Sequence, residues 1–196
     1  MHSTLDQIEP IFNQFKDRAN IECEIRIGKL TKSHFDTDVG KNTFLKILSG
    51  LEKYQGWEKI EKSKTIAYFK GDIRVIDNED TNVTVCHKKT KIKKIDINLN
   101  SQPFDIRFSI ASEIPCQKPK DAVYDDMRVR DRISFIRKNL SIDMTKVTGD
   151  PDDLDSEQAE RYEIELEIID PKIVTDKNIL YNIVYKVIDI LKLLSK

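Results

Sequence analysis

Two segments of the chain carry glutamates at every second position, the spacing that places side chains on one face of a β-strand. One reads Ile-Glu-Cys-Glu-Ile-Arg-Ile over residues 21–27, and the other reads Arg-Tyr-Glu-Ile-Glu-Leu-Glu-Ile-Ile over residues 161–169. Two carboxylates about 5 Å apart repel by about 3 kcal/mol at an effective dielectric of roughly 20. Such stripes persist if they point apart into water or converge on cations, and we favour a divalent metal because it prefers carboxylate oxygens. The stripe carboxylates are Glu22, Glu24, Glu163, Glu165 and Glu167.

Charge is abundant in the chain but balanced. Charged residues make up 34% and apolar residues 39% of the sequence, with a formal net charge of −1. This balance excludes a global field that would indicate a nucleic-acid or membrane partner. The three cysteines are odd in number and lack Cys-x-x-Cys spacing, so we expect them to be reduced and structural. Without a signal peptide or an apolar run of about 18 residues, we expect a soluble intracellular protein with no membrane partner.

The hydrophobic periodicity predicts one domain over residues 1–196, with helices near both ends and strands in between. In the first helix, Pro10 would remove a backbone hydrogen bond, so we expect two short helical pieces there. The expected parts are an N-terminal helix in 1–19, a barrel in 20–170 with a helix at 40–54, and a C-terminal packing helix in 171–196.

Eight or nine strands with few helices between them predict a mainly β (α+β) fold, an antiparallel sheet closed into a barrel. Several strands are charged on one face and apolar on the other, which predicts a polar lumen and an apolar outside covered by the helices. The acidic segment 149–157 lacks strand parity, and we expect a solvated loop there. The expected strands are 21–28, 58–70, 72–78, 81–88, 91–99, 104–112, 127–137, 139–147 and 161–169.

A second set of strands carries basic and hydroxyl residues with the same period of two. The segment 127–135 alternates three arginines, and the segment 140–147 alternates serine, aspartate and threonine. Guanidinium forks suit the oxygens of a phosphate chain, and lysines add point charge. Acidic strands facing basic strands in one lumen would bind a metal-complexed polyphosphate. The residues of this set are Arg74, Lys88, Lys89, Arg107, Arg128, Arg130, Arg132, Ser141, Asp143 and Thr145.

Each stripe taken alone has a plainer interpretation, because Glu-x-Glu or Arg-x-Arg commonly marks a solvated strand face. Two acidic stripes, a triple-arginine stripe and an Asp-x-Thr strand in one chain argue against that interpretation. We expect Trp57 to pack against the barrel, and Lys91, Lys93 and Lys94 to form a solvated edge. The chain has neither a Walker-type glycine loop nor a Cys-x5-Arg signature, which disfavours P-loop and cysteine-phosphatase chemistry.

These residues resemble those of the triphosphate tunnel metalloenzymes over roughly residues 20–170. The segment 21–28 looks like the first glutamate motif of that family, and the segment 162–168 looks like the last. Together with the arginine stripe and the Asp-x-Thr strand, they are similar to the yeast-like branch. That branch comprises the metal-dependent mRNA 5′-triphosphatases of fungi, protozoa and large DNA viruses. One departure is Arg130, because the branch often has lysine at that position.

The resemblance implies a tunnel of eight antiparallel strands, open at both ends, that works with Mg²⁺ or Mn²⁺. The implied metal ligands are Glu22, Glu24 and Glu167. The implied catalytic residues are Glu163, Glu165, Arg130 and Arg132. The implied phosphate contacts are Arg74, Lys88 or Lys89, Arg107, Arg130 and Arg132. The implied supporting residues are Arg26, Glu113, Arg128, Asp143 and Thr145, and the last three would brace the lumen.

The resemblance therefore implies an enzyme that removes the γ-phosphate from triphosphate-ended RNA, the first step of mRNA cap formation. One alternative keeps the fold and changes the substrate to tripolyphosphate, thiamine triphosphate or free nucleotides. Another is a non-catalytic module that binds polyphosphate or RNA ends. The sequence leaves open whether the chain acts alone, as a homodimer or with a capping guanylyltransferase. The implied location is the nucleus for a cellular protein, and a cytoplasmic viral factory or the virion for a viral one.

Overall fold

A computed structural model describes residues 2–120, 123–149 and 160–195, so the expected acidic loop lies largely outside the described residues. The strands within these ranges are β1 (Ile21–Leu30), β2 (Phe35–Asp36), β3 (Lys59–Lys70), β4 (Ile73–Asn78), β5 (Val83–Ile97), β6 (Asp105–Pro115), β7 (Asp126–Arg137), β8 (Leu140–Thr148) and β9 (Arg161–Ile168). They form one antiparallel sheet in the order β2-β1-β6-β5-β4-β3-β7-β8-β9.

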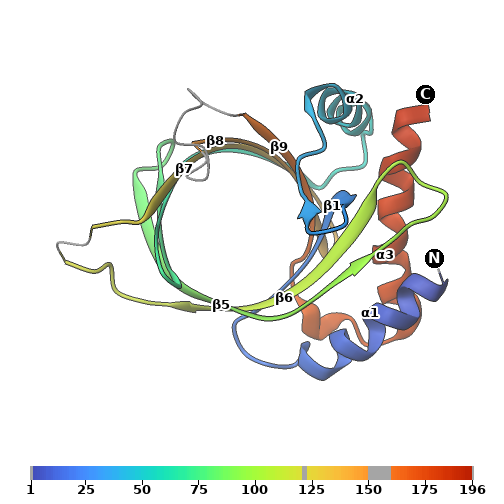
Figure 1. Ribbon diagram of the computed structural model, residues 1–196, viewed down its shortest axis with the longest axis horizontal. Coiled ribbons are helices and arrows are strands. Elements are labelled where there is room, and N and C mark those ends of the chain that lie inside the picture. The colour runs from blue at the N-terminus through green and yellow to red at the C-terminus, as the bar shows by residue number, and fades with distance from the viewer. Residues whose placement is uncertain (1, 121–122, 150–159, 196) are drawn as a thin grey trace.

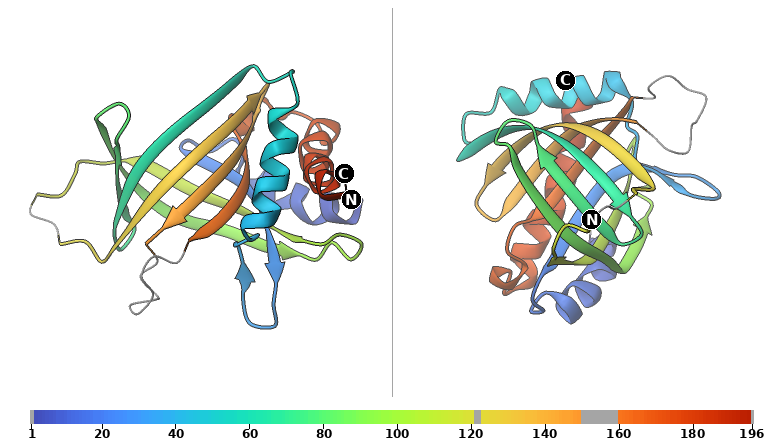
Figure 2. Two further views of the ribbon diagram at one scale, coloured as in Figure 1. Left: turned by 90° about the horizontal axis from the view of Figure 1, so that it is seen from above. Right: turned by 90° about the vertical axis from the view of Figure 1, so that its left-hand side faces the viewer.

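An additional antiparallel pairing of β1 with β9 closes this sheet into a barrel. The short strand β2 pairs with the end of β1 and stays outside the ring, so the barrel has eight strands. Figure 1 shows the ring end-on, and Figure 2 shows the strands crossing it obliquely, as closure of a barrel requires. The expected fold class, a closed antiparallel eight-stranded barrel, is confirmed.

Alternation along the strands separates a polar interior from an apolar exterior. On β1 the side chains of Cys23, Ile25 and Ile27 are fully buried in the hydrophobic core outside the barrel. Their neighbours Glu22, Glu24 and Arg26 point the other way, into the barrel. The same parity holds on β9, where Ile164, Leu166 and Ile168 are core residues. The polar lumen expected from the sequence is therefore present.

Three α-helices in the described part of the chain cover one side of the barrel (Figure 1). They are α1 (His2–Phe15), α2 (Lys41–Glu52) and α3 (Lys177–Leu191). Helix α2 contacts β9, α1 contacts β5 and β6, and α3 packs against α1. Asp176 caps α3 by accepting hydrogen bonds from the backbone N–H groups of Asn178 and Ile179. None of the described helices is long and apolar enough to cross a membrane.

Two expectations about the elements were wrong. Helix α1 is continuous through Pro10, because Pro10 lies on its exposed side while Leu5, Ile8 and Phe12 are buried against the core. The separate strands expected at 81–88 and 91–99 are one long strand, β5. Its pairing with β6 shifts register between Lys91 and Lys93, so a bulge interrupts the alternation without ending the strand.

Candidate active site

The two acidic stripes lie on neighbouring strands of the barrel. In the pairing of β1 with β9, Glu24 is directly opposite Glu167 and Arg26 is directly opposite Glu165. Directly opposed residues in an antiparallel pair have their Cβ atoms about 5 Å apart. The register therefore brings the carboxylates together inside the barrel. We call this surface the acidic wall, formed by Glu22, Glu24, Glu163, Glu165 and Glu167.

Arg26 lies within the acidic wall and bridges its two strands. Its Nε is 2.9 Å from Oε1 of Glu24, and its Nη2 is 2.8 Å from Oε1 of Glu165. Ser109 on β6 also donates a hydrogen bond of 3.2 Å to Glu24. Glu24 and Glu165 are both almost completely buried, so these partners replace the water that each carboxylate has lost.

Arg132 joins the acidic wall from the other side, through β8. Its guanidinium donates to Thr145 at 3.0 Å, to Asp143 at 3.1 Å and to Glu165 at 3.2 Å. Burial alone would raise the pKa of Glu165, but the guanidiniums of Arg26 and Arg132 hold it at about 2. Glu165 is therefore ionised at neutral pH and forms ion pairs with two arginines.

Two other carboxylates of the acidic wall are under-neutralised. Burial, then the charge of Glu24, raises the pKa of Glu22 to about 8, although Lys89 forms an ion pair with it. Burial, then the charge of Asp143, raises the pKa of Glu167 to about 7. Oε2 of Glu22 is buried and meets no donor in hydrogen-bond geometry among the described residues. The acidic wall thus carries more negative charge than its own cations neutralise.

This donor set fits a divalent metal. Glu22, Glu24 and Glu167 offer carboxylate oxygens from adjacent strands, and the raised pKa values of Glu22 and Glu167 reflect burial and crowding of negative charge. In the described part of the chain, no three His, Cys, Asp or Glu side chains are already gathered into a metal-binding group. Glu24 is turned to Arg26 and Ser109 instead, and Glu22 is turned to Lys89.

A second interior surface carries arginines. We call it the arginine wall, formed by Arg74 on β4 with Arg128 and Arg130 on β7. Burial lowers the pKa of Arg74, and burial lowers that of Arg130 to about 10. Within the described residues neither guanidinium has a carboxylate within ion-pair distance, whereas Arg128 is 3.1 Å from Asp126 on its own strand. Two partly buried cations without carboxylate partners among the described residues form a natural site for an anion.

The remaining predicted residues differ in the face of the sheet on which they lie and in the partners that they already have. Lys89 faces the interior and lies 2.9 Å from Glu113, while Lys88 faces outward and pairs with Asp72, so only Lys89 can contact a ligand in the lumen. Arg107 also faces inward, but Asp96 holds it through two contacts of 2.6 and 2.9 Å. Nε and Nη2 of Arg107 are therefore already engaged.

Several interior residues were not anticipated from the sequence. Ser109 and Thr37 hydrogen-bond the acidic wall, Thr37 through a 3.0 Å bond to Glu163. Phe69 lies among the residues of the arginine wall. The period of two in β3 and β6 could have assigned Phe69 and Ser109 to the lumen face, but their partners depend on register. Trp57 packs on Phe135 at a centroid distance of 5.4 Å, as expected.

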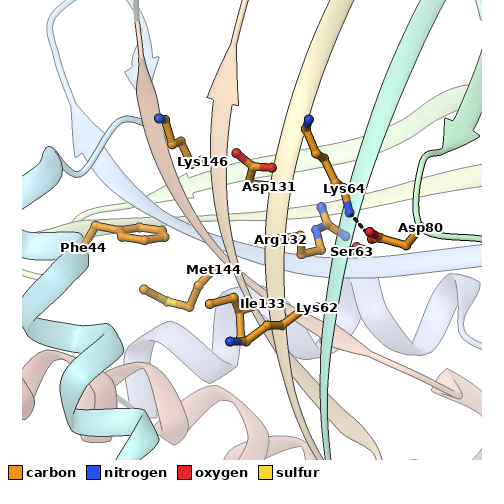
Figure 3. Close-up of a pocket in the computed structure, with 10 residues that line it drawn as sticks. All are labelled: Phe44, Lys62, Ser63, Lys64, Asp80, Asp131, Arg132, Ile133, Met144 and Lys146. Carbon is orange, nitrogen blue, oxygen red and sulfur yellow. Dashed lines mark hydrogen bonds between the residues drawn. The ribbon is translucent and has the colours of Figure 1, made fainter.

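A pocket of about 350 Å³ lies on the outer face of the barrel, between β3, β7, β8 and α2 (Figure 3). Lys62, Lys64 and Asp131 line it from positions that alternate with the lumen residues. Figure 3 shows the backbone of Lys64 bonded to Asp80, an outer-face contact of 2.8 Å. The pocket lacks a converging set of carboxylates or guanidiniums, and we assign no chemistry to it.

Comparison with known proteins gives both sequence and structural relatives. A family model described as "mRNA capping enzyme, beta chain" matches residues 54–181. The mRNA-capping enzyme subunit beta of Schizosaccharomyces pombe is 33% identical over 97 residues, which are 48% of this chain and 31% of that protein. The subunit of the same name from Yarrowia lipolytica is 36% identical over 81 residues, which are 41% and 21% of the two chains. The chain thus spans less than a third of these curated relatives.

Solved structures share the fold at low sequence identity. The S. pombe Pct1 RNA triphosphatase, in complex with the Spt5 CTD, superposes with a TM-score of 0.83 and 19% identity, covering 96% of this chain and 92% of that one. The Mimivirus capping enzyme triphosphatase superposes with a TM-score of 0.70 and 20% identity, covering 98% of both chains. At these identities the likeness demonstrates a common fold.

Proposed function

Because this chain belongs to the family of mRNA capping enzyme beta chains, we propose that it is a metal-dependent RNA 5′-triphosphatase. It would hydrolyse the γ-phosphate of triphosphate-ended mRNA and leave a diphosphate end for capping. One observation carries this proposal: a closed barrel holds an over-charged acidic wall together with an arginine wall in which, among the described residues, Arg74 and Arg130 have no ion-pair partner. A metal-complexed polyphosphate would supply a cation to the acidic wall and phosphate oxygens to the arginine wall.

On the acidic wall, Glu22, Glu24 and Glu167 would hold Mg²⁺ or Mn²⁺. The bound ion would supply Lewis-acid neutralisation of the γ-phosphate oxygens. Both oxygens of Glu165 are already engaged by Arg26 and Arg132, so Glu165 would act by fixing those guanidiniums. Among the described residues, Glu163 accepts a hydrogen bond on one oxygen only, from Thr37. Glu163 would orient the attacking water.

On the cationic side, Arg130 and Arg74 would receive the phosphate oxygens, with Arg132 and Lys89 at the border of the acidic wall. Their charge would offset the negative charge that the terminal phosphoryl group carries through the transition state. The water oxygen would bond to the γ-phosphorus while the bond from that phosphorus to the β–γ bridging oxygen breaks and leaves its electron pair on the diphosphate end. One water proton would stay on the released phosphate as a hydroxyl, and the other would pass to solvent. No covalent enzyme intermediate is required.

The partners and location follow from this role as part of the same proposal. The diphosphate RNA end is the substrate of a guanylyltransferase, so a capping guanylyltransferase is the natural partner of this chain. Its place would be the nucleus in a cellular system, or the viral factory or virion in a viral one.

The test is release of phosphate from RNA labelled at the γ-position, with Mn²⁺ or Mg²⁺ and with a chelator. We expect inorganic phosphate and diphosphate-ended RNA only when metal is present. Tripolyphosphate, thiamine triphosphate and ATP are measured in parallel as competing substrates. Higher kcat/KM for a small polyphosphate than for RNA would favour the other tunnel hydrolases. Absence of release from every substrate would leave a binding module.

A further inference from the structure

A single aromatic ring stands at the centre of the arginine wall. The guanidinium carbons of Arg128, Arg74 and Arg130 lie 5.2, 5.5 and 5.8 Å from the centroid of the Phe69 ring. Cation–π attraction is significant within about 6 Å of a ring centroid. Phe69 therefore contacts every member of the arginine wall.

The barrel register explains this convergence. Phe69 lies on β3, between β4 and β7, and is directly opposite Arg74 on one side and Asp126 on the other. Arg128 and Arg130 follow on the same face of β7, because they are two and four residues beyond Asp126. Guanidiniums from both neighbouring strands thus reach the Phe69 ring. A shift of the β3 register by one residue would turn that ring to the outside of the barrel.

The ring orients the arginines in a different way from a carboxylate. A carboxylate would occupy guanidinium N–H donors and cancel their charge, as Glu165 and Asp143 do for Arg132. An aromatic face attracts the cation through its quadrupole and accepts no strong hydrogen bond. Arg74 and Arg130, which have no ion-pair partner among the described residues, therefore keep their donors available beside Phe69.

We propose that Phe69 is a positioning residue that spaces the three guanidiniums of the arginine wall for a phosphate chain while leaving the charge and donors of Arg74 and Arg130 free. This role rests on the proposed function, since it specifies how the same lumen receives its anion. Phe69 acts through the arginines and makes no contact with the reacting atoms.

The test is the affinity of the full chain for inorganic tripolyphosphate, measured by calorimetry in a chelating buffer so that no turnover occurs. Phe69→Met keeps the side-chain bulk and removes the ring, and we expect about tenfold weaker binding. Phe69→Tyr keeps the ring and should bind within about twofold of wild type. Tyr68→Met is the matched control, because Tyr68 points outward on the same strand and packs on Tyr124 in a tilted arrangement.

A double-mutant cycle with Arg74→Gln separates positioning from packing. If Phe69 acts through Arg74, the loss caused by Phe69→Met should shrink when Arg74 is already replaced. Unchanged affinity in Phe69→Met, an equal loss in Phe69→Tyr, or strict additivity with Arg74→Gln would overturn the proposal. So would a Phe69→Met protein that fails to fold, because Phe69 would then be a core residue. Binding in the chelating buffer with no hydrolysis of γ-labelled RNA once Mn²⁺ is supplied would count against the proposed function alone.

Discussion

The acidic wall and the arginine wall occupy one lumen but are stabilised differently. Carboxylates such as Glu24 and Glu165 have arginine and hydroxyl partners, yet Glu22 and Glu167 still hold pKa values of about 8 and 7. In the arginine wall, Arg74 and Arg130 lie against a phenylalanine ring and have no carboxylate partner among the described residues. Neither wall neutralises the other. Each retains charge for a ligand of its own, a cation on one side and an anion on the other.

The largest expected effect separates metal ligation from bulk charge. Glu24→Gln should reduce hydrolysis of γ-labelled RNA by about 1,000-fold, because losing several kcal/mol of transition-state stabilisation corresponds to such a factor. The protein should remain folded, since removing one of several crowded carboxylates relieves repulsion. Glu52→Gln, an exposed position on α2, serves as the control. Wild-type turnover of Glu24→Gln at saturating Mn²⁺ would remove Glu24 from the ligand set.

The next effect tests which face of β9 is polar. Leu166 is fully buried outside the barrel, so Leu166→Asp should cost several kcal/mol of folding free energy and yield an unfolded or aggregated protein. Ile169→Asp, at a position that is 49% exposed just beyond the same strand, should fold. Circular dichroism during urea unfolding measures both variants. A stable Leu166→Asp protein would mean that the strand parity is reversed.

A smaller effect distinguishes two arginines of one strand. Arg132→Gln should lower the free energy of unfolding by about 3 kcal/mol, because it strands the buried Asp143 and Glu165. Arg130→Gln should change that free energy by less than about 1 kcal/mol, because Arg130 has no ion pair among the described residues and a partly buried cation is removed. Equal losses in urea unfolding would show that Arg130 is also held by the fold.

The smallest effect is a pH dependence of the metal-free protein. Between pH 4.5 and 8 the folded chain keeps protons on Glu22 and Glu167 that the unfolded chain has released. Stability should therefore fall as pH rises through this window. Glu165, with its pKa near 2, releases its proton below the window and does not offset this trend. Melting temperatures with a chelator should fall from pH 5 to pH 8, and saturating Mn²⁺ should flatten the dependence. A flat profile without metal would contradict an over-charged acidic wall.

Much of this arrangement follows from alternation alone. The glutamates of β1 and β9 and the arginines of β7 could be assigned to one face because the spacing of two is a local property of the chain. Partners across strands could not be assigned, because register is fixed by distant segments. The contacts of Phe69 with arginines of two other strands therefore could not be predicted, and the choice between Lys88 and Lys89 depends on the pairing of β5 with β6. The bulge near Lys91 also hid the continuity of β5, because it disturbs the alternation on which the prediction relied.

The division of the lumen into an acidic wall that binds a cation and an arginine wall that binds an anion is tested most directly by metal affinity. Mn²⁺ binding is titrated by electron paramagnetic resonance at neutral pH for the wild type, Glu24→Gln and Arg130→Gln, without any polyphosphate. We expect Glu24→Gln to lose most of its Mn²⁺ affinity and Arg130→Gln to bind Mn²⁺ as tightly as the wild type, or more tightly because a nearby cation is gone. Equal affinity in the wild type and Glu24→Gln, or loss of affinity in Arg130→Gln alone, would contradict the division.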